Sequence, residues 1–369
     1  MIVRNETAVL NRLFTSLQDH IDYWVIVDTG STDGTQDFIH KWFEQAGIPG
    51  ELHERAWVNF GHNRQQALEL AVASGRSDWL LFIDADEELS ISQPDVFRQL
   101  EPGVSYNLAK QHGDLSYLVP ALVNIRENQW CWKAPVHEYL KRMEGPDRFR
   151  TLDGACILYY EGEGFRSTGK TVEEKFLGDA RLLERHLKQH PEDSRSQFYL
   201  ANSYRDAKCF EAAYAAYAKR CSMKGWYEED FSARLQLGRM AIELKKSEDL
   251  VLEHLLDAFD FRPSRAEPLY DLARYFRLKD RFAPAMLYAK AGVQLPQPND
   301  RLFVEDSVYQ WRLLDELAVA AYWVGDFEAS KRACEEIIRK AEQGMLLAEQ
   351  ELLRVRENLR FALEKLDTA

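Results

Sequence analysis

The chain has 369 residues, of which 46% are hydrophobic and 29% charged, and it carries a net charge of −13. This length predicts two or three domains of ordinary globular composition, and the acidic balance argues against a general nucleic-acid binder, which would present a basic face. The negative net charge does not exclude a local basic pocket. The longest apolar runs, at 79–83 and 117–123, are too short for a membrane span.

The cysteine pattern indicates in which cellular compartment the protein is expected. The five cysteines are scattered, odd in number and never spaced as CxxC. This favours reduced thiols in a cytoplasm over a disulfide framework or a zinc site. The start of the chain does not resemble a signal peptide, because Arg4 and Glu6 interrupt its short apolar beginning. We therefore expect a cytoplasmic protein.

Up to about residue 165, strand-like and helix-like segments alternate. An apolar start, "MIVR", precedes a segment of helical spacing, "VLNRLFTSL". A β-branched run, "YWVIVD", precedes "TDGTQDFIHKWFEQAG", which has the signals of a capped helix. A possible strand "ELHERAW", a helix "NFGHNRQQALELAVAS" and a buried strand "DWLLFIDAD" follow. Such alternation predicts an α/β domain with a mainly parallel sheet, whose ligands bind beyond the carboxyl ends of the strands.

From about residue 172 the pattern is entirely helical, and it repeats. Three segments, beginning near 196, 266 and 315, share an apolar helix, a short polar turn, an aromatic residue and a second helix rich in small residues. Phe210 and Phe282 lie two periods of about 36 residues apart, and an insertion around "QLPQPNDRLFVED" lengthens the next interval. The pattern favours stacked tetratricopeptide-like repeats, with an irregular helical bundle as the alternative. Residues 172–193 are expected to form the joining helix.

The stretch "VDTGSTDGT" at 27–35 is the first candidate for chemistry. A strand ends at Asp28, a tight turn follows, and Asp33 can cap the next helix by accepting from its first free N–H groups. One interpretation is simply a well-made turn between a strand and a helix. The other makes Asp28 an acceptor for a nucleobase N–H or a ribose hydroxyl.

The second candidate is Asp84-Ala85-Asp86. In a strand, residues two apart face the same side, so both carboxylates would converge. Carboxylates so placed suit Mg²⁺ or Mn²⁺, which could bind phosphate oxygens and neutralise a leaving diphosphate. Glu87 and Glu88 are expected to be solvated bystanders at the start of a turn. The alternative is a surface turn with spare charge.

The third candidate is the adjacent pair His137 and Glu138 in "WCWKAPVHEYL". Apolar neighbours on both sides predict that at least one of them is partly buried. A partly buried glutamate holds its proton more tightly and can act as a general base. The alternative is a strand with a core-facing histidine and a paired surface glutamate.

Five motifs of this chain closely resemble those of family 2 glycosyltransferases of the GT-A fold. In chain order they are "MIVRNE", "VDTGSTDGT", "NFGHNR", "LFIDADEEL" and "APVHEYL". The second half resembles a subgroup in which tetratricopeptide-like helices follow the catalytic domain. The resemblance implies a GT-A, Rossmann-like, mostly parallel domain at 1–168 and a helical repeat domain at 169–369. It further implies inverting, metal-dependent transfer of a hexose from a nucleotide diphosphate sugar, most often UDP-linked and UDP-glucose-like, to an acceptor hydroxyl.

The resemblance also implies roles for individual residues. Glu138 would deprotonate the acceptor hydroxyl, and His137 would touch the metal, the diphosphate or the acceptor. Asp86 would bind Mn²⁺ or Mg²⁺, Asp84 would bind the metal or the ribose, and Arg64 would lie near the nucleotide or diphosphate. The nucleoside pocket would be lined by Val3, Arg4, Glu6 and Asp28.

Two departures from the family pattern stand out. The family's first strand usually begins several residues before "MIVRNE", so the strand here is short or the true start lies upstream. Related enzymes often carry a histidine metal ligand where this chain reads "ILYYEGEGF", which leaves the third protein ligand open. Arg166 and Lys170, just beyond, could contact phosphate or be solvated loop charges.

Two rival functions are weighed. A helical-repeat scaffold with an inactive front domain would fit the departures, but the intact Asp84, Asp86 and Glu138 speak against it. A nucleotidyltransferase would want an early Gly-rich basic loop, which the sequence lacks. The expected partners are a nucleotide-sugar donor and an acceptor that is a glycan, a lipid-linked saccharide or a protein or peptide. The helical half could form a homodimer.

Overall fold

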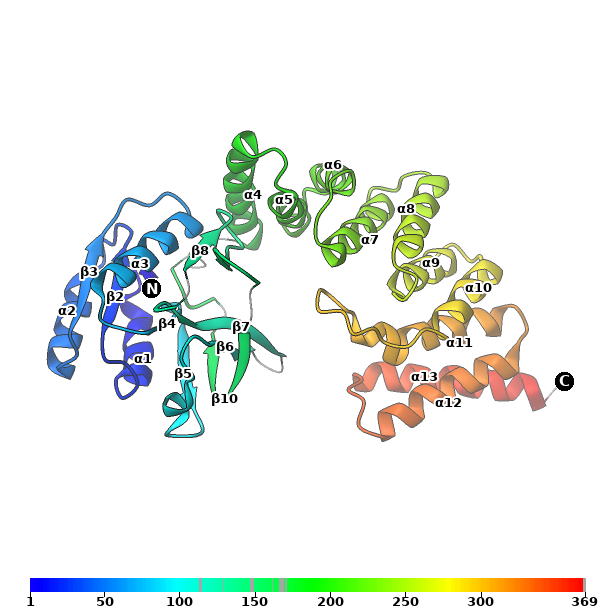
Figure 1. Ribbon diagram of the computed structural model, residues 1–369. Helices are drawn as coiled ribbons and strands as arrows, with labels where there is room; N and C mark the ends of the chain where they lie inside the picture. Colours follow the sequence, from blue (N-terminus) through cyan, green and yellow to red (C-terminus); the bar gives the residue numbers. More distant parts are fainter. Residues whose placement is uncertain are drawn as a thin grey trace. The chain divides into compact units, whose positions relative to one another are not determined.

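The computed structural model describes residues 1–112, 115–127, 129–146, 149–160, 162–165, 169 and 171–367. Its internal contacts divide it into two units, Met1–Gln189 and His190–Ala369, whose elements are labelled in Figure 1. The expected division after residue 168 falls before helix α4 (Val172–Gln189), which belongs to the first unit by its contacts.

Three short parallel strands open the first unit, in the order β1-β2-β3. They are β1 (Ile2–Val3), β2 (Trp24–Asp28) and β3 (Gly50–Glu54), and they alternate with α1 (Thr7–Leu17), α2 (Thr35–Ala46) and α3 (Phe60–Ser74). Val3 lies opposite Asp28, and Asp28 lies opposite Glu54, so the three strands end at one edge. The alternation predicted for this segment is confirmed. The side chains that follow β1 and β2 meet at that edge.

The second sheet of this unit is mixed. Its order is β4-β7-β6-β10-β5, and only β10 and β6 pair in parallel, while the other neighbours are antiparallel. The prediction of a mainly parallel sheet is therefore wrong for this half of the unit. The remaining elements of the unit are β4 (Trp79–Leu81), β5 (Glu87–Ile91), a 3₁₀ turn η1 (Val96–Gln99), β6 (Ser105–His112), β7 (Leu115–Asn124), β10 (Phe149–Tyr159) and a separate antiparallel hairpin of β8 (Trp130–Lys133) and β9 (Tyr139–Arg142).

One apolar cluster joins both sheets of the first unit. Leu10, Leu13 and Phe14 of α1 are fully buried and pack in the same cluster as Ile26 of β2 and Leu108 of β6. These α1 positions repeat at helical spacing, so one face of the helix is apolar and the other faces water. Burial of this face fixes α1 against the sheets and holds the edge that carries Asp28.

The second unit consists of helical pairs. Within the described residues from 190 on, no strand occurs, as predicted. The helices are α5 (Ser194–Asp206), α6 (Phe210–Cys221), α7 (Tyr227–Glu243), α8 (Glu248–Phe261), α9 (Glu267–Arg277), α10 (Phe282–Gly292), a π-helical turn η2 (Val308–Arg312), α11 (Leu313–Trp323), α12 (Phe327–Glu342) and α13 (Glu349–Asp367). Phe210, Phe282 and Phe327 each begin the second helix of a pair. The repeated aromatic thus marks the same position in these three pairs, whereas the pair α7 and α8 has Glu248 there. Paired helices at this spacing resemble tetratricopeptide repeats.

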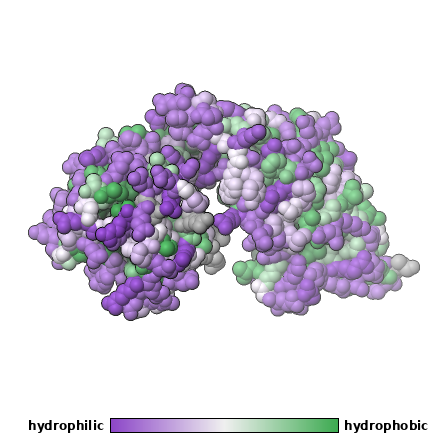
Figure 2. Space-filling view, in the orientation of Figure 1, coloured by the Kyte–Doolittle hydropathy of each residue, from purple (hydrophilic) through white to green (hydrophobic). Residues whose placement is uncertain are grey.

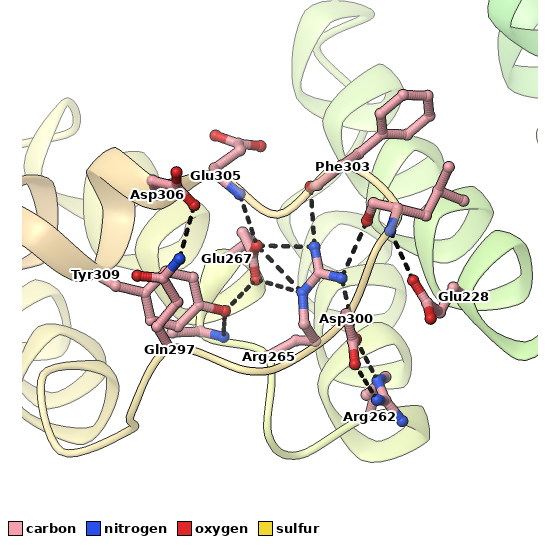
Figure 3. A network of polar contacts seen from close by, with 12 residues as sticks. Glu228, Arg262, Arg265, Glu267, Gln297, Asp300, Phe303, Glu305, Asp306 and Tyr309 are labelled. Atoms are coloured by element: carbon pink, nitrogen blue, oxygen red, sulfur yellow. Dashed lines mark hydrogen bonds and ion pairs between the residues drawn. The ribbon is translucent and has the colours of Figure 1, made fainter. Parts of the chain in front are cut away.

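A buried polar network holds the insertion between α10 and η2 (Figure 3). Arg265 is 1% exposed and donates to Glu267, to Asp300 and to the carbonyl oxygens of Leu302 and Phe303. Glu228 accepts the backbone N–H of Leu302 at 2.6 Å. Because the buried charges are paired and hydrogen-bonded, the network fixes one conformation of the insertion.

The surface of the chain is predominantly polar where Figure 2 shows it, with small scattered apolar patches on both units. Among the residues that the structure describes, none of the helices combines the length and the apolar character needed to cross a membrane. All five cysteines are free thiols in the structure, two of them, Cys131 and Cys334, buried.

Candidate active site

Arg64 joins two carboxylates that lie far apart in the sequence. Its Nη2 donates to both oxygens of Asp84, at 2.6 and 2.8 Å, and its Nε donates to Glu138 Oε1 at 2.6 Å. Burial lowers the pKa of Arg64, but Asp84 and Glu138 more than offset this, so its pKa lies above its usual value. The same partnership holds the pKa of Asp84 below its usual range, although burial opposes it. The predicted residues Arg64, Asp84 and Glu138 thus form one cluster.

The turn that carries Asp84 and Asp86 differs from the predicted strand. Strand β4 ends at Leu81, and Asp84–Glu87 form a turn closed by the Glu87 N–H and the Asp84 carbonyl, 3.2 Å apart. The two aspartates are therefore placed by a turn and not by the pleat of a strand. Their charges still interact, because Asp84, after burial, is a cause of the raised pKa of Asp86.

Glu87 is a structural part of this turn, which corrects its expected role as a solvated bystander. It is 3% exposed, accepts the Asp84 N–H at 2.7 Å and forms an ion pair with Lys110 of β6. Glu88 is the more exposed neighbour and accepts from the Tyr160 hydroxyl at 2.8 Å. Lys110 was not singled out from the sequence. Its partner Glu87 could have been, because Glu87 and the buried Leu89 are two apart and share one face of β5.

Glu6 and Asp86 carry negative charge that the cluster does not neutralise fully. Burial raises the pKa of Glu6 to about 7, the N–H of Phe165 opposes the shift, and Asp86, Asp33 and Asp84 add to it. Burial and Asp84 likewise raise the pKa of Asp86. Crowded carboxylates with raised pKa values fit a cation, because a cation would relieve their repulsion.

The donor set of this turn fits Mg²⁺ or Mn²⁺ as a carboxylate pair. Magnesium in proteins is commonly held by one or two carboxylates, with waters and substrate phosphates completing its shell. Among the described residues, no group of three His, Cys, Asp or Glu side chains gathers closely enough to hold a metal ion. The expected set of Asp84, Asp86 and His137 is therefore not gathered as three protein ligands. Arg64 engages both oxygens of Asp84, which leaves Asp86 as the more available ligand.

The predicted nucleoside residues lie at the edge where β1 and β2 end. Asp28 is fully buried, and its Oδ1 accepts from the N–H groups of Gly30 and Ser31 at 2.8 and 2.9 Å and from Gln36. Its Oδ2 has no hydrogen-bond partner among the described residues. A buried acceptor left unpaired is costly, so an incoming N–H or O–H donor would be stabilised there.

A cavity of about 350 Å³ opens beside this edge. Val3, Arg4 and Glu6 line it together with the aromatic side chains of Trp57 and Phe60, and α4 contributes to its wall. This volume lies in the range of small-molecule pockets, and the mixture of apolar walls with a few polar groups is typical of them. Three of the four predicted nucleoside residues, Val3, Arg4 and Glu6, therefore line one cavity. Thr29, the residue after Asp28, also lines it. The two aromatic residues were missed, since one aromatic in a loop and one at the first position of a helix carry no periodic signal.

The turn between β8 and β9 is strained and carries Glu138. Ala134 and His137 adopt φ values of 66° and 52°, in the left-handed region that non-glycine residues rarely occupy. The N–H of Phe60, at the start of α3, donates to the Pro135 carbonyl at 3.0 Å. Since α3 also carries Arg64, one helix end both anchors this turn and pairs with its glutamate. Such strain is commonly found at functional sites. The predicted contacts of Arg166 and Lys170 lie outside the described residues.

Substitution of Gly61 by alanine is expected to disturb this anchor. An added Cβ would lie 2.0 Å from the Ala134 carbonyl oxygen, so the turn that holds Glu138 must move. We expect a loss of about 1–3 kcal/mol of unfolding free energy, as for other overpacked sites, and slower turnover. Urea denaturation measures the first effect. Gly178→Ala in α4 is the matched control, since its Cβ meets nothing within 4 Å and alanine favours a helix. An equally stable Gly61 variant would contradict the expectation.

The pKa of Glu6 predicts a pH dependence of stability. Because its folded pKa is raised to about 7 from an ordinary 4.5, the protonated form is favoured by folding. Its stabilisation is complete below about pH 4.5 and is lost as the pH rises through about 7. The Tm of the wild type should therefore fall relative to that of Glu6→Gln across this window. Parallel Tm curves for the two proteins would rule the expectation out.

Comparison with known proteins adds a family match at the N-terminus. Residues 1–99 match the family described as glycosyl transferase family 2. An uncharacterized glycosyltransferase of Rickettsia felis is 30% identical over 131 residues, which are 35% of this chain and 40% of that protein. The lipopolysaccharide core biosynthesis glycosyltransferase LpsC of Rhizobium meliloti is 33% identical over 100 residues, 27% of this chain and 35% of that protein. The chain thus spans less than half the length of these curated relatives.

One solved structure resembles part of the chain, including its helical second unit. The crystal structure of YrrB, a TPR protein with an unusual peptide-binding site, shares 11% identity and a TM-score of 0.35, and the match covers 47% of this chain and 81% of that protein. The similarity at this level is weak, and the repeat character of the second unit rests on its own helical pairs.

Proposed function

Residues 1–99 belong to glycosyl transferase family 2, and from this premise we propose that the chain is an inverting, metal-dependent glycosyltransferase. It would move a hexose from a nucleotide diphosphate sugar, a UDP-sugar such as UDP-glucose, to an acceptor hydroxyl. In this proposal the first unit, for which the boundary at residue 168 is extended to include α4, forms a GT-A domain, and the second unit forms a tetratricopeptide-like domain. The observation that carries the proposal is the cluster in which Arg64 holds Asp84 and Glu138 together, with Asp86 beside it.

The donor nucleoside would occupy the cavity lined by Val3, Arg4 and Glu6. The free oxygen of buried Asp28 supports this assignment, because a base N–H or a ribose hydroxyl would supply the donor that it lacks. Trp57 and Phe60, which contact each other edge to face, would offer an apolar wall to the base.

Asp86 would hold Mg²⁺ or Mn²⁺, with Asp84 contributing to the metal or to the ribose. The ion, when bound, would neutralise charge on the donor diphosphate. Arg64 is oriented by both carboxylates and keeps Asp84 from turning away. A fixed arginine fork also suits recognition of phosphate oxygens. The protein part of the site thus binds and orients the donor.

Glu138 would accept the proton of the acceptor hydroxyl as that oxygen attacks the anomeric carbon. A bond forms between the acceptor oxygen and the sugar, the bond between the sugar and the diphosphate breaks, and the configuration inverts. The proton ends on Glu138, whose Oε1 is held by Arg64. His137, in the strained turn beside it, would contact the acceptor or the diphosphate.

The acceptor and the setting of the reaction are part of the proposal. A glycan, a lipid-linked saccharide and a protein or peptide each carry the hydroxyl that the reaction needs, and the relative LpsC is named for lipopolysaccharide core biosynthesis. Free thiols at all five cysteines support a reducing compartment such as the cytoplasm. Dimerisation through the helical unit stays a prediction, which a solution measurement of molecular mass tests.

The test is a donor screen that measures UDP release in the presence of Mn²⁺ across common UDP-sugars. We expect release or binding with at least one donor, and its loss in Glu138→Gln or Asp86→Ala with the fold retained. If no donor is bound or hydrolysed by the wild type, or if Asp86→Ala is equally active, the inactive helical scaffold becomes the better account.

A further inference from the structure

Three aromatic side chains are exposed at one end of the helical pair α7 and α8. Trp226 and Tyr227, at the start of α7, are 41% and 48% exposed, and Phe261, the last residue of α8, is 39% exposed. The rings of Trp226 and Tyr227 contact each other edge to face, with 6.4 Å between their centroids. These three residues are termed the aromatic strip. Large apolar side chains gathered on a surface commonly mark a binding site, and the proposed sugar transfer does not use this one.

Two arginines join the rings of the aromatic strip. The guanidinium group of Arg262 lies 4.7 Å from the ring centre of Tyr227, and that of Arg234 lies 4.3 Å from the ring centre of Phe261. Tyr227 and Arg234 belong to α7, whereas Phe261 and Arg262 lie at the end of α8. The two cation–π contacts therefore tie the two helix ends together and make one continuous surface.

Each of these arginines is also paired with a carboxylate. Arg262 donates to Asp300 at 2.6 Å, and Arg234 forms an ion pair with Asp257 at 3.0 Å. Both arginine side chains are partly exposed, and Asp257 is exposed. The two ion pairs thus place hydrogen-bond donors and acceptors beside the rings without a net charge of their own.

The protein holds this surface in one conformation. The hydroxyl of Tyr227 donates to Glu228 at 3.2 Å, and the same carboxylate accepts the backbone N–H of Leu302 in the buried network of Figure 3. Asp300, the partner of Arg262, belongs to the same insertion. A surface whose groups are already fixed loses little conformational entropy when a ligand binds. The network therefore prepares the strip for binding.

A buried arginine supports the turn that precedes the strip. Arg220 is fully buried and forms an ion pair with Asp230 at 2.6 Å. The backbone of Gly225 passes so close that a Cβ added there would lie 2.6 Å from Nη2 of Arg220. The chain thus rests on this guanidinium group immediately before Trp226, and the position of that exposed ring is set from below. Rigid support of this kind is what a binding site needs.

The chemistry of the aromatic strip fits a neutral saccharide. One face of a pyranose ring presents C–H groups, which pack against the negatively polarised face of an aromatic ring. Its hydroxyl groups both donate and accept, so they can bond the guanidinium and carboxylate groups of the two ion pairs without bringing a charge. A polyanion would instead need cations that no carboxylate has engaged. A lipid surface would bring its phosphates against the exposed Asp257.

We propose that the aromatic strip is a binding site for a neutral saccharide chain. Trp226 and Phe261 would stack on its sugar rings, and the pair of Arg262 and Asp300 would bond its hydroxyl groups. Tyr227 would keep Arg262 oriented. Because all of these residues belong to the second unit, the proposal stands whether or not the first unit transfers a sugar.

The experiment titrates the full chain into fluorescein-labelled cellohexaose, maltohexaose, mannohexaose and chitohexaose and follows fluorescence anisotropy. No nucleotide sugar is present, so the result does not depend on catalysis. We expect saturable binding of at least one oligosaccharide, changed by less than about twofold between ~0.1 and ~1 M salt, because no net charge drives it. Trp226→Ala should bind at least about fivefold more weakly, and Trp226→Phe should recover part of the loss because it keeps a ring. Phe261→Ala should act in the same direction.

The matched control is Trp323→Ala, since Trp323 of α11 is 62% exposed and lies outside the aromatic strip. Its affinity should equal that of the wild type, and circular dichroism checks that all variants fold. The proposal would be overturned if the wild type bound none of the four oligosaccharides, or if Trp323→Ala weakened binding as much as Trp226→Ala. Tighter binding of heparin or single-stranded DNA than of any neutral oligosaccharide would overturn it too. So would a dimer, measured by light scattering, that Trp226→Ala converts to a monomer, because a second copy would then cover the strip.

Discussion

Replacement of Asp86 by asparagine is expected to reduce sugar transfer by at least about 100-fold while the protein stays folded. A carboxylate that holds the cation contributes several kcal/mol of charge stabilisation in the transition state, and about 3 kcal/mol corresponds to a factor of this size. Burial and Asp84 raise the pKa of Asp86, so its charge is disfavoured in the folded protein. Asparagine removes that charge, and the Tm at neutral pH should be unchanged or higher.

The control for Asp86 is its neighbour Glu88. Glu88 is more exposed than Glu87 and contacts Tyr160 and Arg12 at the surface, away from Arg64. Glu88→Gln should retain turnover within about twofold, as surface changes usually do. UDP release at saturating donor measures activity, and thermal unfolding measures stability. A severe effect at Glu88 with a mild one at Asp86 would reverse the roles given to the two residues.

The local sequence was sufficient where chemistry and periodicity agree. The run 24–28 is β-branched and ends in Asp28, and the structure has strand β2 over the same residues. Asp33 accepts the N–H of Thr35, the first residue of α2, at 3.0 Å, as its place before the helix predicts. In the second unit, Phe210, Phe282 and Phe327 marked the starts of α6, α10 and α12, whereas α8 begins at Glu248. These features depend on neighbours in the chain, which a sequence displays directly.

The mixed sheet could not be predicted by the same reasoning. Alternation of strands and helices predicts parallel pairing only where a helix connects each pair of strands. Between Glu87 and Tyr159 the described residues contain no such helix. β6 and β7 are consecutive antiparallel strands, and β10 pairs with β5 and β6 over long sequence separations. The same limit applies to the site. Asp84 and Glu138 could be singled out separately. The hydrogen bonds by which Arg64 links them could not be predicted, because these partners lie 20 and 74 residues from Arg64 in the sequence.

Glu87 shows how a local expectation fails. Four acidic residues within five positions suggest a solvated turn, and Glu88 fits that description. Glu87, however, begins strand β5, and its side chain lies on the buried face with Leu89. The ion pair with Lys110 makes this burial tolerable, because a buried charge needs a partner. The partner lies on another strand, so the acidic run alone could not reveal it.

Loss of the Arg64 side chain is expected to damage both stability and chemistry. Arg64→Ala leaves Asp84 and Glu138 without the cation that joins them, and Glu138 is only 13% exposed. Breaking a buried ion pair costs about 3–5 kcal/mol, and we expect about 3 kcal/mol because the Asp84 side chain is 36% exposed. Turnover should also fall, since neither carboxylate would keep its position. Urea denaturation and UDP release measure the two effects.

A lysine at position 64 separates charge from geometry. It keeps the positive charge, but a single ammonium group cannot reproduce the planar fork that contacts Asp84 and Glu138 at once. Arg64→Lys should therefore recover part of the stability while turnover stays low. Arg126→Ala is the control, because its ion pair with Asp78 is exposed and should contribute less than about 1 kcal/mol. Two results would contradict this role of Arg64: an Arg64→Lys variant as active as the wild type, or an Arg64→Ala variant no less stable than Arg126→Ala. Either result would mean that Arg64 does not position the two carboxylates, and the cluster would then not be the catalytic centre.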